Sequence, residues 1–374
     1  MTEIQQTREK VRIRPDIAAM EHYTPTASLE VFSERLGRPI NEIVKLDANE
    51  NPYGPSAGAL AALADLRGVV NIYPDPESRK LRALLQDYVG VSAGHILVGA
   101  GADELIDLIL RLFIAPGDGV INCPPTFGMY EFDAALVGAQ MIAVPRRADF
   151  SLDVPAIEAA AHEHDARLLF LCSPNNPDGG LIAPDVLDRL LALPLVVVLD
   201  EAYAEFSGTA SFAVRVPHTP NLIVLRTFSK WAGLAGLRAG YGIFPLDLMA
   251  HLWKIKQPYN LNVAADAAAR ASLQDLPALQ ANVQRIISER ERLERELAAF
   301  PFLQPYPSRS NFVLCRVEGL AAADLRTALE AEGVLVRYYN KPGLRDHIRI
   351  SAGTPQQTDA LLAALRKVLA DHQV

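Results

Sequence analysis

The sequence predicts an α/β protein with two parts: a large domain with a mostly parallel seven-stranded sheet covered by helices, and a smaller α+β domain. Between about residues 94 and 245, short apolar runs bounded by Gly, Pro and Asn alternate with helical patterns, which predicts the large domain. Several runs are apolar on both faces, which predicts strands that are buried on both sides. After residue 281 the pattern changes to one long charged helix followed by short strands and helices, which predicts the small domain.

Seven apolar runs predict the strands of the large sheet. Because several of them are apolar on both sides, we expect helices to cover both faces of the sheet. Between the first two runs, Leu105, Leu108, Ile109 and Leu112 recur with the spacing of an amphipathic helix that begins directly after a Gly-Ala-Gly-Ala segment. The predicted strands are 95–101, 119–125, 140–144, 167–174, 195–203, 222–229 and 239–244.

Both ends of the chain contribute to the predicted small domain. Residues 1–45 hold one helix, at about 27–37, and have too little apolar mass to fold alone, so we expect them to pack on the small domain or on a partner subunit. We predict a large domain at 46–264 and a small domain formed by 1–45 and 265–374. Its predicted elements are a helix at 281–299, a strand at 311–317, a helix at 321–331, strands at 334–339 and 347–351, and a last helix around 361–369.

The composition excludes several classes of protein. Half of the 374 residues are apolar and the formal net charge is -8, which argues against a general nucleic-acid or membrane-surface binder. The N-terminus has no apolar signal core, and no run approaches the ~18 apolar residues of a membrane span, so we predict a cytoplasmic protein. We expect the three cysteines to be buried reduced thiols. His162 and His164 have the wrong helical spacing for two metal ligands, so no metal site is predicted.

Lys230 follows one of the predicted strands, in the segment Thr-Phe-Ser-Lys-Trp. Its apolar neighbours can desolvate the amine, which lowers its pKa and makes it a nucleophile toward an aldehyde. Thr227, Ser229 and Arg238 surround it in sequence and offer hydroxyl and guanidinium donors to a phosphate. Taken alone, such a lysine is far more often an exposed loop residue, so the prediction depends on the reactive residues at the other strand ends.

Asp200 ends a run that is too apolar to hold a carboxylate without a partner. A protonated ring nitrogen would be that partner, and pyridoxal phosphate requires such an anion because its pyridinium ring is the electron sink. The alternative is a helix N-cap. Tyr203, three residues on, would donate to the phenolate oxygen of the ring.

Three further segments end strands at the same predicted edge, where open α/β sheets bind ligands. Asn176 lies in a turn after the strand at 167–174, with an amide donor for the same phenolate oxygen. Ala102 and Asp103 begin the helix after the first strand, so their N–H groups would bind an oxyanion. A dinucleotide loop is disfavoured there because Glu104 replaces its last Gly. Phe127 is placed to stack on an aromatic ring, or to be core.

Two arginines lie inside the apolar strands of the small domain, Arg337 and Arg349. A buried guanidinium marks either a bound anion or a structural ion pair, and its planar fork suits a carboxylate or a phosphate.

Taken together, eight motifs resemble those of the histidinol-phosphate aminotransferases, a branch of the fold type I pyridoxal-phosphate enzymes. The resemblance runs from about residue 11 to the C-terminus. The motifs are NENPYG (49–54), YPDPES (73–78), GAGADE (99–104), PPTFGMY (124–130), SPNNPDG (173–179), LDEAY (199–203), RTFSKWAGLAGLRAGYG (226–242) and RISAGT (349–354).

The resemblance implies a fold type I enzyme with pyridoxal 5'-phosphate and a homodimer with shared sites. Its implied substrates are L-histidinol phosphate with 2-oxoglutarate, or imidazole-acetol phosphate with glutamate, in histidine biosynthesis. The implied catalytic residues are Lys230 as Schiff-base lysine and proton shuttle, Asp200 on the pyridine nitrogen and Tyr203, with Asn176, on the phenolate oxygen. The implied phosphate ligands are Ala102, Asp103, Ser229 and Arg238, with Tyr53 from the neighbouring subunit; Phe127 stacks on the ring, and Tyr23, Asn176, Arg337 and Arg349 bind the substrate anion.

Two departures from the family pattern bear on the substrate. Asp178 stands where the family more often has Thr, and HYTPTAS (22–28) replaces a segment that often holds a Pro-Gly pair. The alternatives are an aromatic amino-acid aminotransferase or a phosphate-amino-acid lyase on the same scaffold. A ligand-binding regulator is more remote, because such regulators carry an extra helix-turn-helix domain for which this acidic chain has no spare length.

Overall fold

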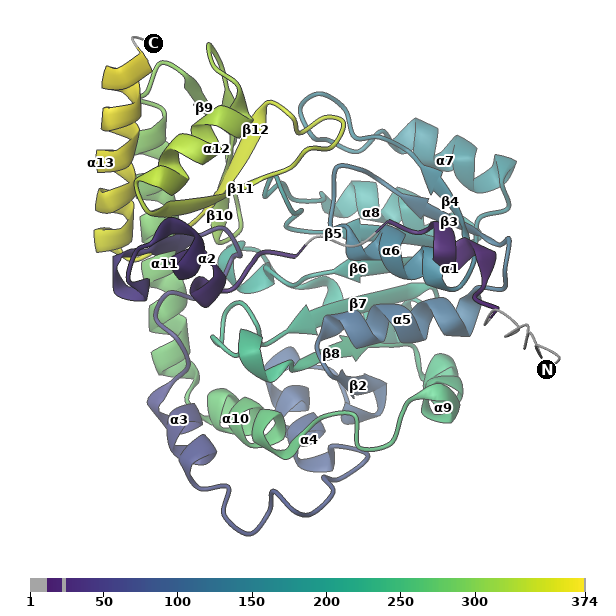
Figure 1. Cartoon of the computed structure of the whole chain (residues 1–374). Helices are drawn as coiled ribbons and strands as arrows, with labels where there is room; N and C mark the ends of the chain where they lie inside the picture. The colour runs from purple at the N-terminus through teal and green to yellow at the C-terminus, as the bar shows by residue number, and fades with distance from the viewer. Residues whose placement is uncertain (1–11, 22–24, 373–374) are drawn as a thin grey trace, which may run out of the picture.

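The computed structural model describes residues 12–21 and 25–372, which form two bodies built on one sheet each (Figure 1). The large body holds a seven-stranded sheet in the order β2-β8-β7-β6-β5-β3-β4. Strand β8 runs antiparallel to β2 and β7, and the remaining pairs are parallel, so the predicted α/β fold with a mostly parallel sheet is confirmed. The strands are β2 (Ile96–Gly99), β3 (Gly119–Asn122), β4 (Gln140–Ala143), β5 (Leu168–Cys172), β6 (Val196–Asp200), β7 (Leu222–Thr227) and β8 (Gly240–Ile243).

Helices cover both faces of this sheet, as apolar strands require. Successive strand residues alternate between two cores: Val197 and Leu199 belong to one, while Val198 lies in the other. The first face packs against α3 (Ala57–Ala64), α4 (Arg79–Val89), α7 (Val154–Glu163), α8 (Pro184–Leu191) and α10 (Val263–Gln274). The second face packs against α5 (Ala102–Phe113), α6 (Met129–Leu136) and α9 (Leu246–Ile255).

The small body is built on a five-stranded sheet. Its order is β1-β11-β12-β10-β9, and only the β1–β11 pair is parallel. Apolar side chains of alternate residues form a core with α12 and α13, and the opposite face of the sheet carries Leu335, Arg337 and Arg349. The elements are β1 (Val44–Leu46), β9 (Leu303–Pro305), β10 (Phe312–Val317), β11 (Val334–Tyr338), β12 (His347–Ser351), α12 (Ala322–Ala331) and α13 (Pro355–His372).

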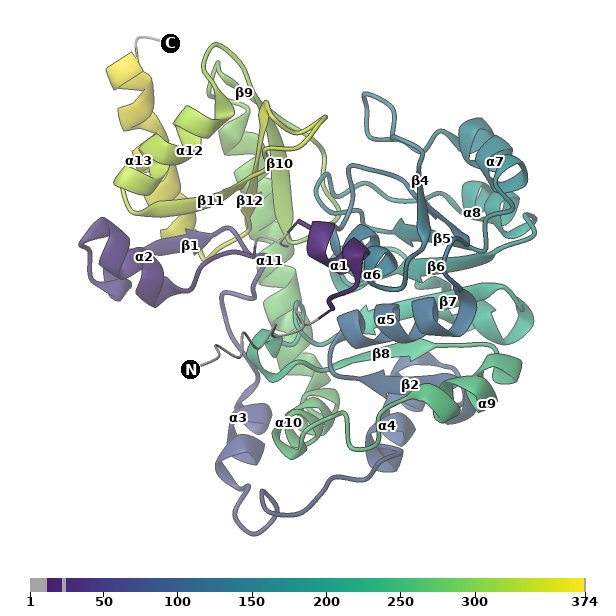
Figure 2. The same ribbon diagram turned by 45° about the vertical axis from the view of Figure 1, so that its right-hand side comes forward.

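The long helix α11 (Leu276–Leu297) connects the two bodies (Figure 2). Its first half contributes Leu279 and Val283 to the core of the large body, and its second half contributes Leu293 and Leu297 to the core of the small one. The division into 46–264 and 1–45 with 265–374 stays a prediction. Along that boundary, α10 packs on α3 and α4 of the large body.

The N-terminal segment packs largely as expected. Helix α2 (Leu29–Leu36) places Phe32 against Ile43 and Leu335, so it lies on the small sheet. The short helix α1 (Pro15–Ala19) lies by α6, where Arg14 donates to the carbonyl of Leu136. Short 3-10 turns complete the described chain: Ile40–Glu42, Ala93–His95, Ala204–Phe206, Phe212–His218 and Ala235–Leu237.

No helix in the described part of the chain is both long and apolar enough to cross a bilayer. All three cysteines are buried and free, as expected: Cys123, Cys172 and Cys315.

Candidate active site

The predicted site residues lie where the strands of the large sheet end. Asp200 is the last residue of β6, and Lys230 follows β7 by three residues. Asn176 follows β5, and Ala102 begins α5 directly after β2. Because the parallel strands share one carboxyl edge, topology brings these four segments to one side of the sheet.

Asp200 is fully enclosed, and its hydrogen bonds come from neutral donors. Tyr130 Oη donates to Oδ2 at 2.6 Å and the Ala202 N–H donates to Oδ1 at 2.9 Å. Burial raises the pKa of Asp200 to about 6, while the Tyr130 hydrogen bond acts in the opposite direction. The carboxylate is therefore held in place without a cation, which suits an acid whose charged partner is a ligand.

Lys230 lies close to the centre of the same region. Its Nζ is 3.4 Å from the carbonyl oxygen of Ala48 and 6.0 Å from the centroid of the Tyr203 ring. Burial first, and then the positive charge of Arg349, lower the pKa of Lys230 to about 8. The amine is therefore closer to neutral at physiological pH than an exposed lysine, as a nucleophile requires.

Tyr203 is buried and oriented by residues from three segments. Asn49 Nδ2 donates to its hydroxyl oxygen at 3.1 Å, and its ring meets Phe312 edge-on at 5.2 Å. Asn49 is itself fixed by Ser351, whose Oγ donates to Asn49 Oδ1 at 3.0 Å. The hydroxyl of Tyr203 is thus positioned by the N-terminal segment and by the small sheet.

The start of α5 forms a cradle for an anion. No side chain of the described residues caps this helix, and its N-cap Gly101 has φ +83°. A Cβ at Gly101 would lie 2.6 Å from Nη2 of Arg238, and one at Gly240 would lie 2.5 Å from the Ala102 nitrogen. Glycine is therefore required on both sides of the cradle. Uncapped N–H groups beside a guanidinium fit a phosphate, so these residues fit the cofactor that the motifs imply.

Asp103 and the two hydroxyls line the same region. Arg238 donates to Asp103 Oδ2 at 2.8 Å, and both side chains are about half exposed. Thr227 Oγ1 donates to Ser229 Oγ at 3.0 Å and accepts from the Ser229 N–H at 3.1 Å. The five predicted phosphate contacts of this chain are therefore near one another: Ala102, Asp103, Thr227, Ser229 and Arg238.

Arg349 joins the small sheet to the large body. It is buried, and it donates to Asn176 Oδ1 and to the main-chain oxygen of Asp47, both at 2.7 Å. Arg337 is its direct partner across β11 and β12, so the two guanidiniums lie on one face of the sheet. Because Asn176 Oδ1 accepts from Arg349, the amide nitrogen of Asn176 is the end that can donate to a ligand.

The remaining predicted residues lie in less direct positions. Phe127 is partly buried, with its ring edge-on to Tyr130 at 5.5 Å. The Tyr53 ring lies under the guanidinium of Arg285 at 3.9 Å, within the same chain. Tyr23 lies outside the described residues. The buried Asp178 accepts from the Gly180 N–H at 2.8 Å and thereby stabilises the turn after Asn176.

Three residues of this site were not singled out from the sequence: Tyr130, Asn49 and Tyr339. Tyr130 and Asn49 lie within motifs that were recognised, PPTFGMY and NENPYG, but their partners come from distant segments. The Tyr339 ring lies near both arginines, with its centroid 5.2 Å from Cζ of Arg337 and 5.7 Å from Cζ of Arg349. Among the residues that the structure describes, no cluster of His, Cys, Asp and Glu could hold a metal ion.

Comparison with known proteins bears directly on this geometry. The family model of the class I and II aminotransferases matches residues 41–365. The chain belongs to this aminotransferase family. Two curated histidinol-phosphate aminotransferases are similar over nearly the whole chain. That of Roseiflexus castenholzii is 54% identical over 95% of this chain and 98% of its own length. The chloroplastic protein of Nicotiana plumbaginifolia is 52% identical over 95% of this chain and 86% of its own.

Solved structures agree with this assignment to the aminotransferases. The histidinol-phosphate aminotransferase of Sinorhizobium meliloti, in complex with pyridoxal-5'-phosphate, superposes with a TM-score of 0.88 at 30% identity, over 96% of this chain and 98% of that one. A double mutant of the aspartate aminotransferase of Thermus thermophilus superposes with a TM-score of 0.79 at 21% identity, over 96% of this chain and all of that one, and shows the fold alone. The family resemblance carried by the eight motifs is confirmed.

Proposed function

We propose that this chain is a pyridoxal-phosphate-dependent aminotransferase of histidine biosynthesis. It would transfer an amino group between glutamate and imidazole-acetol phosphate, or in reverse between L-histidinol phosphate and 2-oxoglutarate. The observation that carries the proposal is the pair Arg337 and Arg349, which presents two cations on the face of the small sheet that Arg349 joins to Asn176 of the large body. All of these substrates carry an anionic group, a phosphate or a carboxylate, that a guanidinium fork binds.

Each part of the cofactor has candidate ligands at the carboxyl edge. We assign its phosphate to the uncapped start of α5 and the adjacent hydroxyl and guanidinium groups, its ring nitrogen to Asp200, and its ring oxygen to Asn176 and Tyr203. Phe127 would pack on the ring. The proposed phosphate ligands are Ala102, Asp103, Thr227, Ser229 and Arg238.

The residues of the chain would divide the chemistry between them. When bound, pyridoxal phosphate supplies a pyridinium ring that withdraws electrons from the substrate carbon. Asp200, whose described partners are all neutral, keeps the ring nitrogen protonated because a buried carboxylate favours a nearby cation. Lys230, with a pKa of about 8, can take a proton from the substrate carbon and return it to a neighbouring position. Tyr203 and Asn176 hold the ring oxygen and so fix the orientation of the ring.

The arginine pair would serve both half-reactions. A transaminase binds its two substrates in turn at one site, so Arg337 and Arg349 must hold a phosphate in one half-reaction and a carboxylate in the other. Arg349 is suited to this because its two hydrogen bonds in the described chain go to neutral oxygens. Its charge is therefore available to either anion. Tyr23 is proposed to join this group.

We also propose a homodimer. The segment from α3 to α4 exposes several large apolar side chains, and Tyr73, the most exposed of them, stacks on Tyr259 at 4.5 Å. Such a patch favours contact with a second copy of the chain. Sedimentation should give a dimer, and Val70→Glu with Ile72→Glu should give a monomer. The role of Tyr53 across the interface stays a proposal, since its ring lies under Arg285 of its own chain.

A cytoplasmic location is proposed as well. It rests on the acidic, globular composition and on three buried free cysteines. Fractionation of the source cells with antibodies to the chain checks it, and recovery from a membrane or extracellular fraction would contradict it.

A substrate panel tests the proposed activity. With glutamate as donor, kcat/KM for imidazole-acetol phosphate should exceed that for phenylpyruvate by at least about 100-fold, since only the former presents a dianionic phosphate to the arginines. A preference for phenylpyruvate would indicate an aromatic amino-acid aminotransferase instead. Release of CO₂ or of phosphate, without amino transfer, would indicate a lyase.

A further inference from the structure

Asp178 is a buried carboxylate at the point where the turn after β5 departs from the family pattern, and the proposed chemistry makes no use of it. Its Oδ1 accepts from Asn175 Nδ2, and its Oδ2 accepts from the Gly180 N–H at 2.8 Å. Burial raises the pKa of Asp178, while the positive charge of Arg146 acts in the opposite direction. Because both oxygens accept from N–H donors, the ionised carboxylate is the form that fits this turn.

The side chain of Asn175 connects two loops of the site. It is fully buried, and its Nδ2 donates to the carbonyl of Pro125 at 3.2 Å as well as to Asp178. Its Oδ1 accepts from Thr126 Oγ1 at 2.7 Å. A flipped amide would place Oδ1 against the Pro125 carbonyl, with two acceptors facing each other. The contacts of Asn175 therefore fix a single orientation of its amide.

Each of these two loops carries a residue that we assign to the cofactor ring. Phe127 directly follows Thr126 in the loop after β3, and Asn176 directly follows Asn175 in the turn after β5. Phe127 is proposed to pack on the ring and Asn176 to hold the ring oxygen. The Asn175 amide is thus a direct link between the segments that carry the two ring contacts.

Gly180 makes room for the carboxylate of Asp178. A Cβ at Gly180 would lie 2.5 Å from Asp178 Oδ2, so an alanine there would displace the carboxylate without changing any charge. The main chain closes the turn by itself. The Asn175 N–H donates to the Gly180 carbonyl at 2.8 Å, and the Gly179 N–H donates to the Asn175 carbonyl at 2.7 Å. Substitutions at 178 or 180 should therefore keep the turn and affect the amide that it carries.

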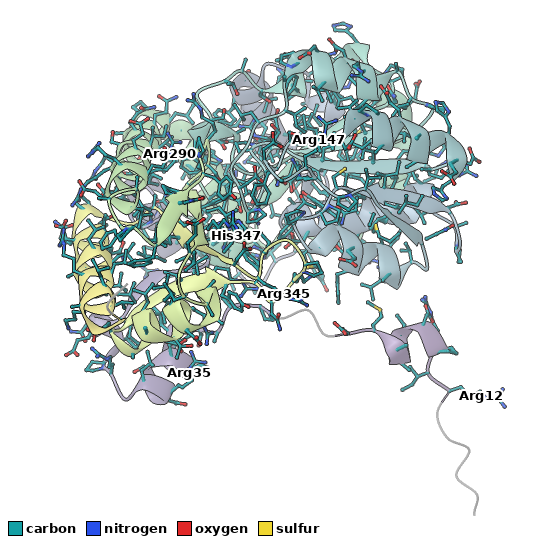
Figure 3. The ribbon with its side chains drawn as sticks, turned by 90° about the horizontal axis from the view of Figure 1, so that it is seen from above. Arg12, Arg35, Arg147, Arg290, Arg345 and His347 are labelled. Atoms are coloured by element: carbon teal, nitrogen blue, oxygen red, sulfur yellow. The ribbon has the colours of Figure 1, made fainter. Side chains whose placement is uncertain are left out.

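The small body also contacts this region. The Arg309 N–H donates to the Gly179 carbonyl at 2.9 Å. Arg146 Nη1 donates to the carbonyl of Phe150 at 2.9 Å, and the Phe150 ring is edge-on to that of His347 at 5.7 Å. Viewed from above, His347 lies where the two bodies meet (Figure 3). The surroundings of the carboxylate are therefore packed by residues from both bodies.

We propose that Asp178 is a positioning residue that orients the Asn175 amide. Through that amide it holds Phe127 and Asn176 at the separation that the cofactor ring requires. The inference rests on the proposed function and deepens it, because it gives the departure at Asp178 a role in the site. It requires two correctly placed acceptor oxygens, so the shape of an aspartate without both acceptors should not suffice.

Two variants of the full-length chain test this after removal of the cofactor. Asp178→Asn keeps the shape of the side chain but presents an amide nitrogen to one of the two donors, and Gly180→Ala displaces the carboxylate. The matched control is Asp149→Asn, since Asp149 also accepts from the N–H two residues on, that of Ser151 at 3.0 Å, but is exposed. The readout is the Kd of pyridoxine 5'-phosphate by calorimetry. This cofactor analogue has no aldehyde, so the measurement needs neither a bond to Lys230 nor turnover.

The expected pattern separates positioning from folding. Asp178→Asn and Gly180→Ala should each raise the Kd by about 10-fold, because a hydrogen bond to a charged group is lost, while Asp149→Asn should stay within about two-fold. Thr126→Val removes the contact at the other end of the amide and should raise the Kd as well. The double variant of Asp178→Asn with Thr126→Val should be within about two-fold of the weaker single variant, because both changes release the same amide. Thermal melts identify any variant that does not fold, and if Asp178→Asn is one, Gly180→Ala decides.

Three results would overturn the proposal. The first is a folded Asp178→Asn or Gly180→Ala variant with an unchanged Kd. The second is an equal rise in Asp149→Asn, which would assign the effect to the loss of a negative charge. The third is a double variant whose effect is the product of the two single effects, which would show that Asp178 and Thr126 act independently. If the enzyme preferred phenylpyruvate, the proposed substrate would be wrong, while these Kd values would still decide the role of Asp178.

Discussion

Strands β6 and β7 carry charged or polar residues on both of their faces, and the two faces accommodate them differently. Asp200 and Thr227 point to the side covered by α5 and α6, whereas their chain neighbours Glu201 and Arg226 point to the opposite side, as alternation along a strand requires. Both pairs are buried. Any difference in how their charges are compensated therefore comes from their hydrogen-bond partners and not from their burial.

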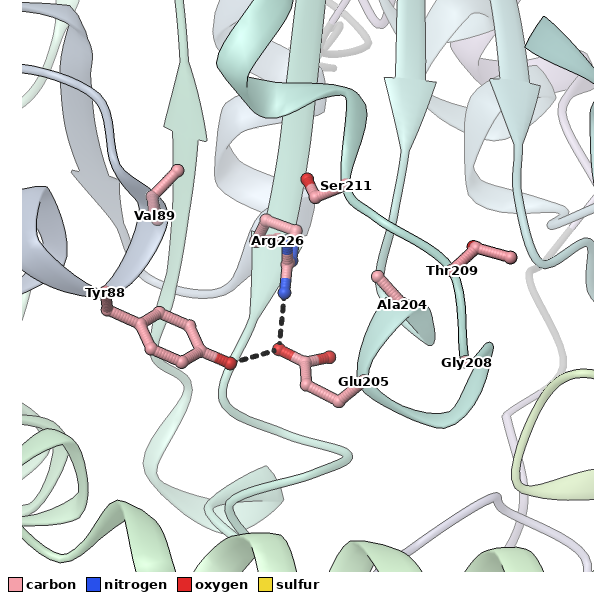
Figure 4. A pocket seen from close by; sticks show the side chains of 8 residues that line it. All are labelled: Tyr88, Val89, Ala204, Glu205, Gly208, Thr209, Ser211 and Arg226. Atoms are coloured by element: carbon pink, nitrogen blue, oxygen red, sulfur yellow. Dashed lines mark hydrogen bonds and ion pairs between the residues drawn. The ribbon is translucent and has the colours of Figure 1, made fainter.

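On the Glu201 and Arg226 side, the charged groups form ion pairs within the chain. Arg226 donates to Glu201 at 3.2 Å and to Glu205 at 2.7 Å. Tyr88 Oη donates to the same oxygen of Glu205 at 3.1 Å (Figure 4). A cavity of about 270 Å³ lies beside this cluster. The charges there bind one another, so the cluster is a structural element that joins α4 to β7.

The Asp200 side is arranged in the opposite way. The hydrogen bonds of Asp200 come from a phenol and an amide N–H, and Arg349 of the small sheet likewise contacts neutral oxygens. A buried charge without an opposite charge is costly, so Asp200 and Arg349 are stabilised when ligands of the opposite charge bind. Among the buried charges compared on these two strands and in the small sheet, Asp200 and Arg349 have neutral hydrogen-bond partners, whereas Glu201 and Arg226 bind each other.

The largest expected effect comes from Asp200→Asn. It should lower kcat/KM by about 10³-fold, because the ring nitrogen loses the anion that keeps it protonated. The stability of the cofactor-free protein should be unchanged or greater, since a desolvated carboxylate is removed. Steady-state kinetics and urea denaturation measure the two quantities. Glu201→Gln is the control and should show the reverse. It should lower the free energy of unfolding and keep kcat/KM per folded molecule within about three-fold of the unsubstituted enzyme.

Arg226→Met should affect stability alone. It leaves Glu201 and Glu205 buried without their cation, so the free energy of unfolding should fall by about 4 kcal/mol. Adding Glu205→Gln should recover part of the loss, because one of the two uncompensated charges is removed. Urea denaturation with activity per folded molecule checks both, and a large loss of kcat in the folded variant would place this cluster in the site.

The pH dependence of stability should distinguish Asp200 from other carboxyl groups. Its folded-state pKa of about 6 lies above the ordinary value of about 3.9 for an unfolded chain, so the folded state binds the proton more tightly. The contribution of Asp200 to the free energy of unfolding should therefore fall as pH rises from about 4 to about 6, by up to about 3 kcal/mol. Melts of the cofactor-free protein should show this fall relative to Asp200→Asn. Parallel curves would contradict the assigned environment.

Tyr130→Phe should have the smallest effect. It removes one hydrogen bond to Asp200, which should cost about 1 kcal/mol and lower kcat/KM by about five-fold. The hydrogen bond lowers the pKa of Asp200, so the acid limb of the pH–rate profile should move to higher pH without it. A profile that moved to lower pH would show that Tyr130 does not act on this carboxylate.

The strand ends that carry the site residues could be predicted from the sequence. The ends of β2, β5, β6 and β7 were predictable because an apolar run that stops at Asp200 or just before Lys230 marks both the strand and the reactive residue. Motif order then supplied the family and the candidate roles. The opposite faces of Asp200 and Glu201 also follow from alternation along one strand.

The partners of these residues could not be predicted, because they depend on contacts between distant segments. Tyr130 reaches Asp200 from α6, and Asn49 reaches Tyr203 from the N-terminal segment. Tyr53 and Arg285 also pack together, although one precedes and the other follows all strands of the large sheet in the sequence. The aromatic environment of Arg349 depends on the register of β10, β11 and β12, which short apolar strands do not specify by themselves.

We assign the cofactor to the amine of Lys230. Lys256 is the best competitor in the described chain, because burial lowers its pKa too, and its Nζ donates to the carbonyls of Pro76 and Gln257. Borohydride reduction of the holoenzyme followed by peptide mapping distinguishes the two. We expect one cofactor per chain, on Lys230, and none on the Lys230→Ala variant. A cofactor found on Lys256, or retained covalently by Lys230→Ala, would contradict it.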